Sequence, residues 1–192
     1  MANNLGENLV LFRIKRAWLL SVTLLVACAS GPPAPDRDCV TRDLVIGLDS
    51  FPPGGSSTDV GRSRYPIVDN AGRSVFYAEG PTTHDVARFP TIAGAIDFFD
   101  NGEGSILRRG RTGALVPSEA LVPKSASFRS GIADQQYLVC DESSCIYYAR
   151  YQEYTTMVAA NMGPNMTGEA LNRVIMEVDR KLTECLAKPL VK

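Results

Sequence analysis

The only histidine of the chain, His84, is the first residue whose chemistry could support catalysis. A serine hydrolase needs a nucleophilic hydroxyl within hydrogen-bond reach of a base, and a third group that orients the base. Ser56 and Ser57 carry candidate hydroxyls, but there is no G-x-S-x-G turn, and Asp85 points to the opposite face of a strand from His84. We therefore predict no catalytic residue and expect His84 to face solvent on a strand.

Oxygen-bearing side chains also gather near the end of a predicted helix, where a cation could bind. They are Asp97, Asp100, Asn101 and Glu103. Calcium loops place such ligands in the register D-x-[DN]-x-[DN]-G, which this spacing does not match. We predict no metal site and no cofactor, and interpret the cluster as a solvated helix end. A metal-dependent enzyme that uses His84 remains the alternative.

The N-terminal part of the chain has the pattern of an export signal. Arg13, Lys15 and Arg16 precede an uncharged run over residues 17–27, an order typical of secretory signal peptides. As a helix this run reaches only about half of a roughly 30 Å hydrocarbon core, so we expect a removed signal rather than a spanning helix. An uncleaved anchor or a buried strand is the alternative.

The signal ends in Leu25-Val26-Ala27-Cys28, which resembles the lipobox of bacterial lipoproteins. The resemblance implies removal of residues 1–27 and lipidation of Cys28 by fatty acyl chains such as palmitate. It implies a lipid anchor in the bacterial cell envelope, on the outer membrane facing the periplasm or on the cell surface. Residues 28–38 are rich in proline and predict an extended tether.

The mature chain left by this cleavage is slightly acidic. Residues 1–27 contain three basic residues and one acidic residue, which leaves 17 basic and 20 acidic residues in the remainder. Phosphate neutralisation requires a clustered positive face, so nucleic acid is not an expected partner. The length suits one domain, which we place at residues 39–188.

Four cysteines follow the lipobox, and an even number in an exported chain predicts disulfides. Cys140 and Cys145 flank a polar turn between two strand-like runs, so a bridge across a hairpin end is natural. That pairing leaves Cys39 with Cys185, which joins the start of the domain to its last helix. A zinc site is the rival interpretation, but the paired C-x-x-C or histidine spacing is missing.

Periodicity predicts an α+β fold, with helices packed on an antiparallel sheet. A hairpin is expected from residues 75–78 and 82–89, a helix from Pro90 to Asn101, and three consecutive strands at 136–140, 145–152 and 154–160. A long C-terminal amphipathic helix follows, with Thr167 as its cap and Pro189 at its end. Residues 43–49 fit a short strand or one helical turn. Residues 51–57 and 103–130 read as loops, with a short strand at 114–116 in the second.

Five tyrosines crowd the predicted strands: Tyr137, Tyr147, Tyr148, Tyr151 and Tyr154. Packing is our first interpretation. The alternative is a rigid recognition surface, in which Tyr148 and Tyr154 are the pair expected to be exposed and to bind.

Several short segments resemble a group of uncharacterised bacterial lipoproteins. They are residues 48–54, 132–137 and 150–154 and the helix from Met166. The resemblance implies envelope location and no activity. We expect a non-catalytic envelope lipoprotein that binds a protein, glycan or small ligand. The alternatives are a small envelope hydrolase or metal-dependent enzyme using His84, and a toxin-immunity or inhibitor lipoprotein.

Overall fold

The centre of the molecule is a six-stranded antiparallel sheet with the strand order β1-β2-β3-β6-β5-β4. The computed structural model describes residues 31–60, 67–101, 128–140 and 143–190. The strands are β1 (Ser56–Val60), β2 (Asp69–Tyr77), β3 (Gly80–Arg88), β4 (Gln135–Cys140), β5 (Ser144–Tyr151) and β6 (Tyr154–Asn161). The predicted α+β class is confirmed.

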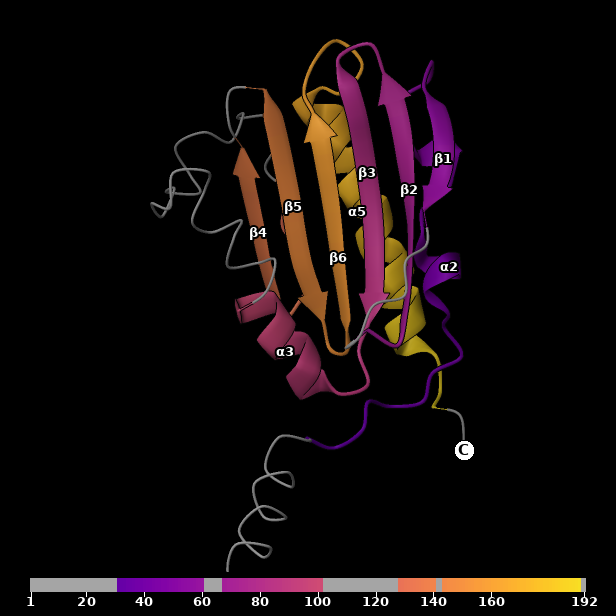
Figure 1. The fold of residues 1–192 in the computed structure, drawn as a ribbon, viewed down its shortest axis with the longest axis vertical. Coiled ribbons are helices and arrows are strands. Elements are labelled where there is room, and N and C mark those ends of the chain that lie inside the picture. Colours follow the sequence, from indigo (N-terminus) through magenta and orange to yellow (C-terminus); the bar gives the residue numbers. More distant parts are fainter. Residues whose placement is uncertain (1–30, 61–66, 102–127, 141–142, 191–192) are drawn as a thin grey trace, which may run out of the picture.

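The sheet consists of two three-stranded meanders that meet in the middle. β1 to β3 form one and β4 to β6 the other, and the pairing of β3 with β6 joins them, with His84 opposite Val158. Figure 1 shows the six strands side by side, with β1 and β4 at the two edges. The central strands are therefore the most protected part of the sheet.

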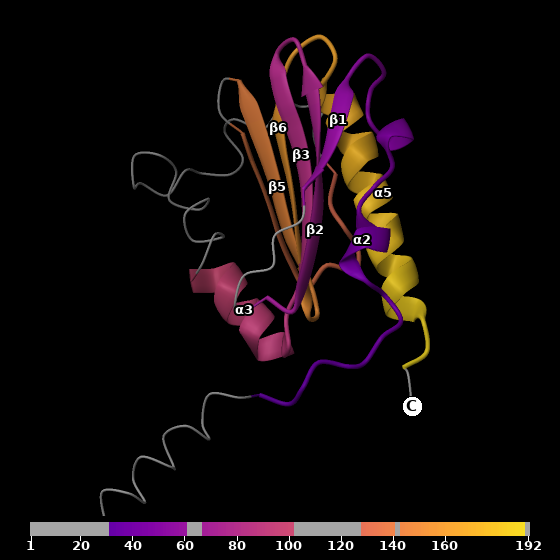
Figure 2. The same ribbon diagram turned by 45° about the vertical axis from the view of Figure 1, so that its right-hand side comes forward.

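One face of the sheet is covered by the long helix α5 (Gly168–Ala187). The hydroxyl oxygen of Thr167 accepts a hydrogen bond from the backbone N–H of Ala170 at 3.2 Å, which confirms the predicted cap. The apolar stripe of α5, with Leu171, Ile175 and Leu182, is buried against the sheet. Figure 2 shows α5 running along the sheet as a separate layer.

A shorter helix, α3 (Ile92–Asn101), packs against the other face at the end where β3 finishes (Figures 1 and 2). Phe99 of α3 stacks on Tyr148 of β5, with ring centroids 4.5 Å apart, and on Tyr137 of β4 at 5.2 Å. Both faces of the sheet are thus covered at this end. None of the helices in the described ranges has the length and hydrophobicity needed to cross a bilayer.

Residues 39–53, which we call the strap, run between the β1–β2 edge and α5 (Figure 2). The strap contains α2 (Thr41–Leu44) and the 3₁₀ turn η1 (Leu48–Ser50). Residues 43–49 are therefore two short helical turns joined by extended backbone. The side chains of Leu44 and Ile46 are buried in the core.

Two elements differ from the sequence prediction. β1 occupies Ser56–Val60, where the predicted loop ended and no strand was expected, and β2 begins at Asp69 rather than near residue 75. The polar residues of β1 have no apolar alternation, so the strand exists because its backbone pairs with β2. The strand expected at 114–116 lies outside the described residues, as do residues 103–127 of the expected loop.

The predicted tether is held against the domain over residues 33–38. The backbone N–H of Ala34 donates to the carbonyl of Pro90 at 2.8 Å, and Arg88 donates to the carbonyl of Pro35 at 2.9 Å. Arg37 forms an ion pair with the buried Glu153 at 3.4 Å. Residues 33–38 therefore pack on the domain instead of standing free of it as a spacer.

Candidate functional site

The single histidine lies in the core, under the strap. His84 is fully buried in the middle of β3, so the expected solvent-facing position is wrong. Its Nδ1 accepts a hydrogen bond from the backbone N–H of Ile46 at 3.3 Å, which places the ring proton on Nε2. Nε2 then donates to the hydroxyl of Thr156 at 3.0 Å, and Thr156 donates to the carbonyl of Asp85 at 3.1 Å.

The environment of His84 keeps the imidazole neutral. Burial, together with the nearby charges of Lys181 and Arg73, lowers the pKa of His84 from 6.5 to about 3. Both ring nitrogens are already occupied by protein partners. A general base must have a nitrogen free to take a proton from a reacting group, so this histidine acts as a structural link between the strap, β3 and β6.

The residues expected to complete a hydrolase site are not brought to His84. Ser57 of β1 lies opposite Val75 of β2, whereas His84 of β3 lies opposite Arg73 of β2. The serine is therefore two strands away from the histidine and displaced from it by two residues along β2. In the acidic cluster Asp97 accepts a hydrogen bond from Asn101 at 2.8 Å, and Glu103 lies outside the described residues. The described ranges contain no group of three or more histidine, cysteine or acidic residues arranged to hold a metal ion.

The tyrosines form packing, not a recognition surface. Tyr148 and Tyr154 are both buried, so the expectation that they are the exposed pair is wrong. Tyr148 is covered by Phe99 of α3, and the hydroxyl of Tyr154 donates to the carbonyl of Cys39 at 3.1 Å. Packing, the first interpretation of the tyrosines, therefore holds for both residues, because helices or the strap cover the two faces of the sheet where they lie.

Both predicted disulfides are present. Cys39 is bonded to Cys185, with Cα atoms 5.9 Å apart, and Cys140 to Cys145, with Cα atoms 4.0 Å apart. The first ties the beginning of the strap to the last turn of α5, and the second closes the β4–β5 hairpin. The proposed lipidation site, Cys28, lies outside the described residues.

One serine that the sequence prediction did not select, Ser130, has an acidic hydrogen-bond partner of the kind found in catalytic sites. The hydroxyl of Ser130 donates to Asp179 of α5, which also accepts a hydrogen bond from Tyr151 at 2.9 Å. The same serine oxygen accepts from the backbone N–H groups of Ile132 and Ala133 at 3.1 and 2.9 Å. Its hydrogen-bonding capacity is full, so Ser130 fastens the entry of β4 to α5 and offers no nucleophile.

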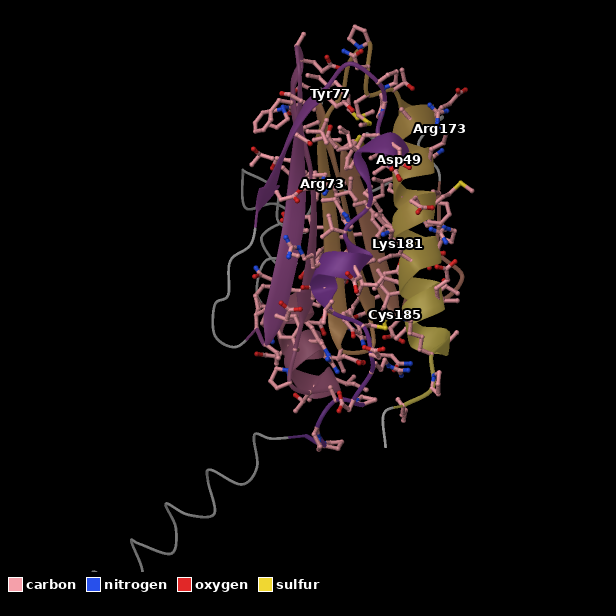
Figure 3. All side chains as sticks on the ribbon, turned by 90° about the vertical axis from the view of Figure 1, so that its right-hand side faces the viewer. Asp49, Arg73, Tyr77, Arg173, Lys181 and Cys185 are labelled. Carbon is pink, nitrogen blue, oxygen red and sulfur yellow. A yellow bond between two sulfur atoms is a disulfide. The ribbon has the colours of Figure 1, made fainter. Side chains whose placement is uncertain are left out.

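Side chains from both sides hold the strap in place. Arg73 of β2 donates to the carbonyl of Ile46 at 2.9 Å, and Lys181 of α5 donates to the carbonyls of Asp43 and Val45 at 2.8 and 3.1 Å. Figure 3 shows Arg73 and Lys181 on opposite sides of this segment, with Tyr77 near its other end. No sequence pattern marks these residues, because each contact joins a long side chain to a distant backbone carbonyl.

A pocket of about 340 Å³ opens between the strap and the β1–β2 edge. Its charged lining consists of Arg42, Asp59, Asp69 and Arg73. Arg73 donates to Asp59 at 2.7 Å, and this hydrogen bond lowers the pKa of the Asp59 carboxyl. The volume is at the lower end of the range for small-molecule sites, and the mixed charge suits polar or zwitterionic groups.

A second pocket, also of about 340 Å³, lies between η1 and the first half of α5. Asp49, Arg173 and Glu177 supply its charge, beside Phe51 and Pro52 of the strap. Figure 3 shows Asp49 and Arg173 on this side of the strap. The strap thus has a polar pocket on each flank.

The chain matches no protein family model and no curated protein.

Proposed function

We propose that the protein is a lipid-anchored lipoprotein of the bacterial cell envelope, whose disulfide-bonded domain binds a protein or glycan partner and performs no catalysis. One observation carries the proposal. Four of the five cysteines pair within the domain, which leaves Cys28 as the remaining cysteine, at the position that the lipobox pattern assigns to acylation. An unpaired cysteine in an exported chain calls for a separate chemical role, and acylation supplies one.

The disulfides support the envelope compartment. Disulfide bonds form and persist in oxidising environments outside the cytoplasm. The bond between Cys39 and Cys185 closes a separation of 146 residues, and in the chain-entropy treatment a bond that closes so long a loop contributes strongly to stability.

Because the two tyrosines expected to bind are buried, the proposed binding role rests on the two pockets beside the strap. The two polar pockets that flank the strap are open to solvent-borne groups and carry charges of both signs. Arg73 and Lys181 fix the strap, and the hydroxyl of Tyr77 donates to the carbonyl of Pro52 at 2.7 Å. Both pockets are therefore preformed, which reduces the cost of ordering on binding.

The test is a comparison of the native protein with a Cys28→Ser variant. In a bacterial host the native protein should fractionate with membranes, and its intact mass should show loss of residues 1–27, added acyl chains and two disulfides. The Cys28→Ser protein should carry no acyl chains and should move to the soluble fraction or remain as the uncleaved precursor. An unmodified Cys28 in the native protein, or an unchanged acylated mass in the variant, would reject the anchor.

A further inference from the structure

The described chain begins at the end of the molecule where β3 stops and α3 starts, which we call the entry pole. Residues 31–40, the start of α3 and the last turn of α5 lie together there (Figure 1). Pro33 forms a β-bridge with Thr91, and Arg37 forms one with Leu190. Gly31 lies against α3, since a Cβ atom on this glycine would be 3.0 Å from the Cβ of Ala93.

The chain between this pole and the proposed acylation site is very short. From Cys28 to Gly31 there are three Cα–Cα steps, which span at most about 11 Å in any conformation. The 20 residues of α5 extend about 30 Å along the domain. Such a short connection keeps the entry pole within about 11 Å of the acylated residue, whereas nothing in the connection holds the opposite end of the domain near the bilayer.

The connection cannot lengthen easily, because the next residues are fixed to the domain. Arg37 donates to the carbonyl of Leu186 at 3.0 Å and to the side-chain oxygen of Gln152 at 2.8 Å, besides its ion pair with Glu153. Release of this segment would leave the Glu153 carboxylate buried without its cation, which is strongly unfavourable.

The entry pole also exposes apolar side chains. Of the eight large hydrophobic residues that are exposed in the described ranges, three lie at this pole, namely Val40, Val68 and Leu190, and a fourth, Ile96, lies on α3, which starts there. Val68 is placed there by the hydrogen bond from its backbone N–H to the carbonyl of Arg88 at 2.8 Å. The exposed charges of Asp36, Asp38 and Lys188 are of both signs, so the surface suits uncharged or zwitterionic lipid headgroups more than an anionic membrane.

We infer that the entry pole is a membrane-contact surface, which rests on the headgroups of the bilayer that holds the acyl chains of Cys28. The pocket between η1 and the first half of α5 then lies away from the lipid plane, whereas the pocket lined by Arg42 and Asp69 lies closer to it, on the flank of the domain. This inference depends on the lipid anchor of the proposed function, and it adds the orientation of the domain and the class of surface that the pole contacts.

Tryptophan fluorescence offers a direct test, because Trp18 is the only tryptophan and lies in the segment expected to be removed. Val68→Trp and Phe76→Trp place reporters near opposite ends of β2, where the native side chains are 55% and 47% exposed. Ile96→Trp and Met176→Trp form a second pair, on α3 and on α5. Each full-length variant is expressed with its native signal, purified in its acylated form and inserted into phosphatidylcholine vesicles, with or without bromine atoms on the acyl chains.

Bromine quenching acts over a short range, whereas the two β2 sites lie about 26 Å apart, so we expect quenching at position 68 at least about twice that at position 76. Position 96 should likewise exceed position 176. Equal quenching within both pairs of acylated protein would overturn the contact surface and leave the lipid anchor standing. Absence of acyl chains on Cys28 by intact mass would overturn both. Urea unfolding midpoints equal to that of the parent protein establish that each reporter leaves the fold intact.

Discussion

Nδ1 of His84 accepts a hydrogen bond from the backbone N–H of Ile46, 3.3 Å away, and so links the central strand β3 to the strap. The bond requires a neutral imidazole, because a protonated Nδ1 has no lone pair to accept it. Protonation of one buried ring therefore breaks a contact between two segments that are 38 residues apart in the chain.

Acid should destabilise the protein through this histidine. The pKa of His84 is lowered to about 3 in the folded protein from 6.5, so between these values the unfolded chain binds more protons than the folded chain. The contribution of His84 to the free energy of unfolding is therefore fully present above pH 6.5 and decreases as the pH falls towards 3. Between pH 7 and pH 5 the free energy of unfolding should decrease by about 2 kcal/mol through this group. The matched control, His84→Gln, should lack this component in urea unfolding at the two pH values. The imidazole signal in NMR should not titrate between pH 7 and 5, and a midpoint near 6.5 would contradict the buried, neutral assignment.

Lys181 should contribute measurably to stability, because its ammonium group donates to two carbonyl groups of the strap. We expect Lys181→Met to lower the free energy of unfolding by about 1.5 to 3 kcal/mol, the range for hydrogen bonds to charged groups. Arg173→Met, at an exposed position on the same helix, should change it by no more than about 0.5 kcal/mol. Loss of the Lys181 charge should also raise the pKa of His84. Similar urea midpoints for the two variants would show that Lys181 does not hold the strap.

The two disulfides should contribute unequally. In the chain-entropy treatment, the bond that closes 146 residues contributes about 5 kcal/mol and the bond that closes five residues contributes about 2 kcal/mol. The double variant Cys39→Ser/Cys185→Ser should therefore lose considerably more stability in urea than Cys140→Ser/Cys145→Ser. The reverse order would indicate that the β4–β5 hairpin, not the link from strap to helix, limits stability.

Removal of the Tyr148 ring should disrupt the contact between α3 and the sheet. Tyr148→Ala deletes a buried ring that stacks on Phe99, and we expect a loss of about 3 to 5 kcal/mol. Phe76→Ala, at an exposed position on β2, should lose about 1 kcal/mol or less. Thermal or urea unfolding of both variants measures the difference, and comparable losses would restore Tyr148 as a surface residue.

Arg37 should be far more important for stability than its position near the start of the domain indicates. Arg37→Met leaves Glu153 buried without its cation and should cost about 3 to 5 kcal/mol, most of which Arg37→Met/Glu153→Met should recover. Arg180→Met removes the ion pairs of an exposed arginine with Glu177 and Glu184, and should cost at most about 1 kcal/mol. A small effect of Arg37→Met in urea unfolding would show that residues 33–38 are only loosely attached.

Sequence patterns predicted the parts of the fold that depend on local signals. The apolar stripe of α5, the cap at Thr167 and the hairpin pairing of Cys140 with Cys145 are each encoded within a few residues, and all are confirmed. β1 escaped prediction because its five residues are mostly polar and its strand conformation comes from pairing with β2. A strand with alternating apolar residues can be recognised from its own sequence. An edge strand that is stabilised only by pairing with its neighbour cannot.

The environment of single side chains was harder to predict than the secondary structure. Alternation along β3 and β5 shows which residues share a face, but it does not show whether a helix or the strap covers that face. His84 and Tyr148 lie on opposite faces, and both faces are covered where these residues lie. The supports from Arg73 and Lys181 depend on backbone groups more than 20 residues away, and no periodicity records such contacts.

The arrangement of the two meanders has a consequence for biogenesis. Each meander pairs only strands that are neighbours in the sequence, so it can form early in folding. The pairing of β3 with β6, which places Thr82 opposite Ala160, joins segments far apart in the chain. The disulfide of Cys39 likewise cannot form until Cys185 is available. Cys39 is synthesised long before Cys185, and the two other thiols of the domain, Cys140 and Cys145, are synthesised in between. A folding catalyst that reshuffles mispaired sulfurs would therefore influence the yield of mature protein more than its final stability.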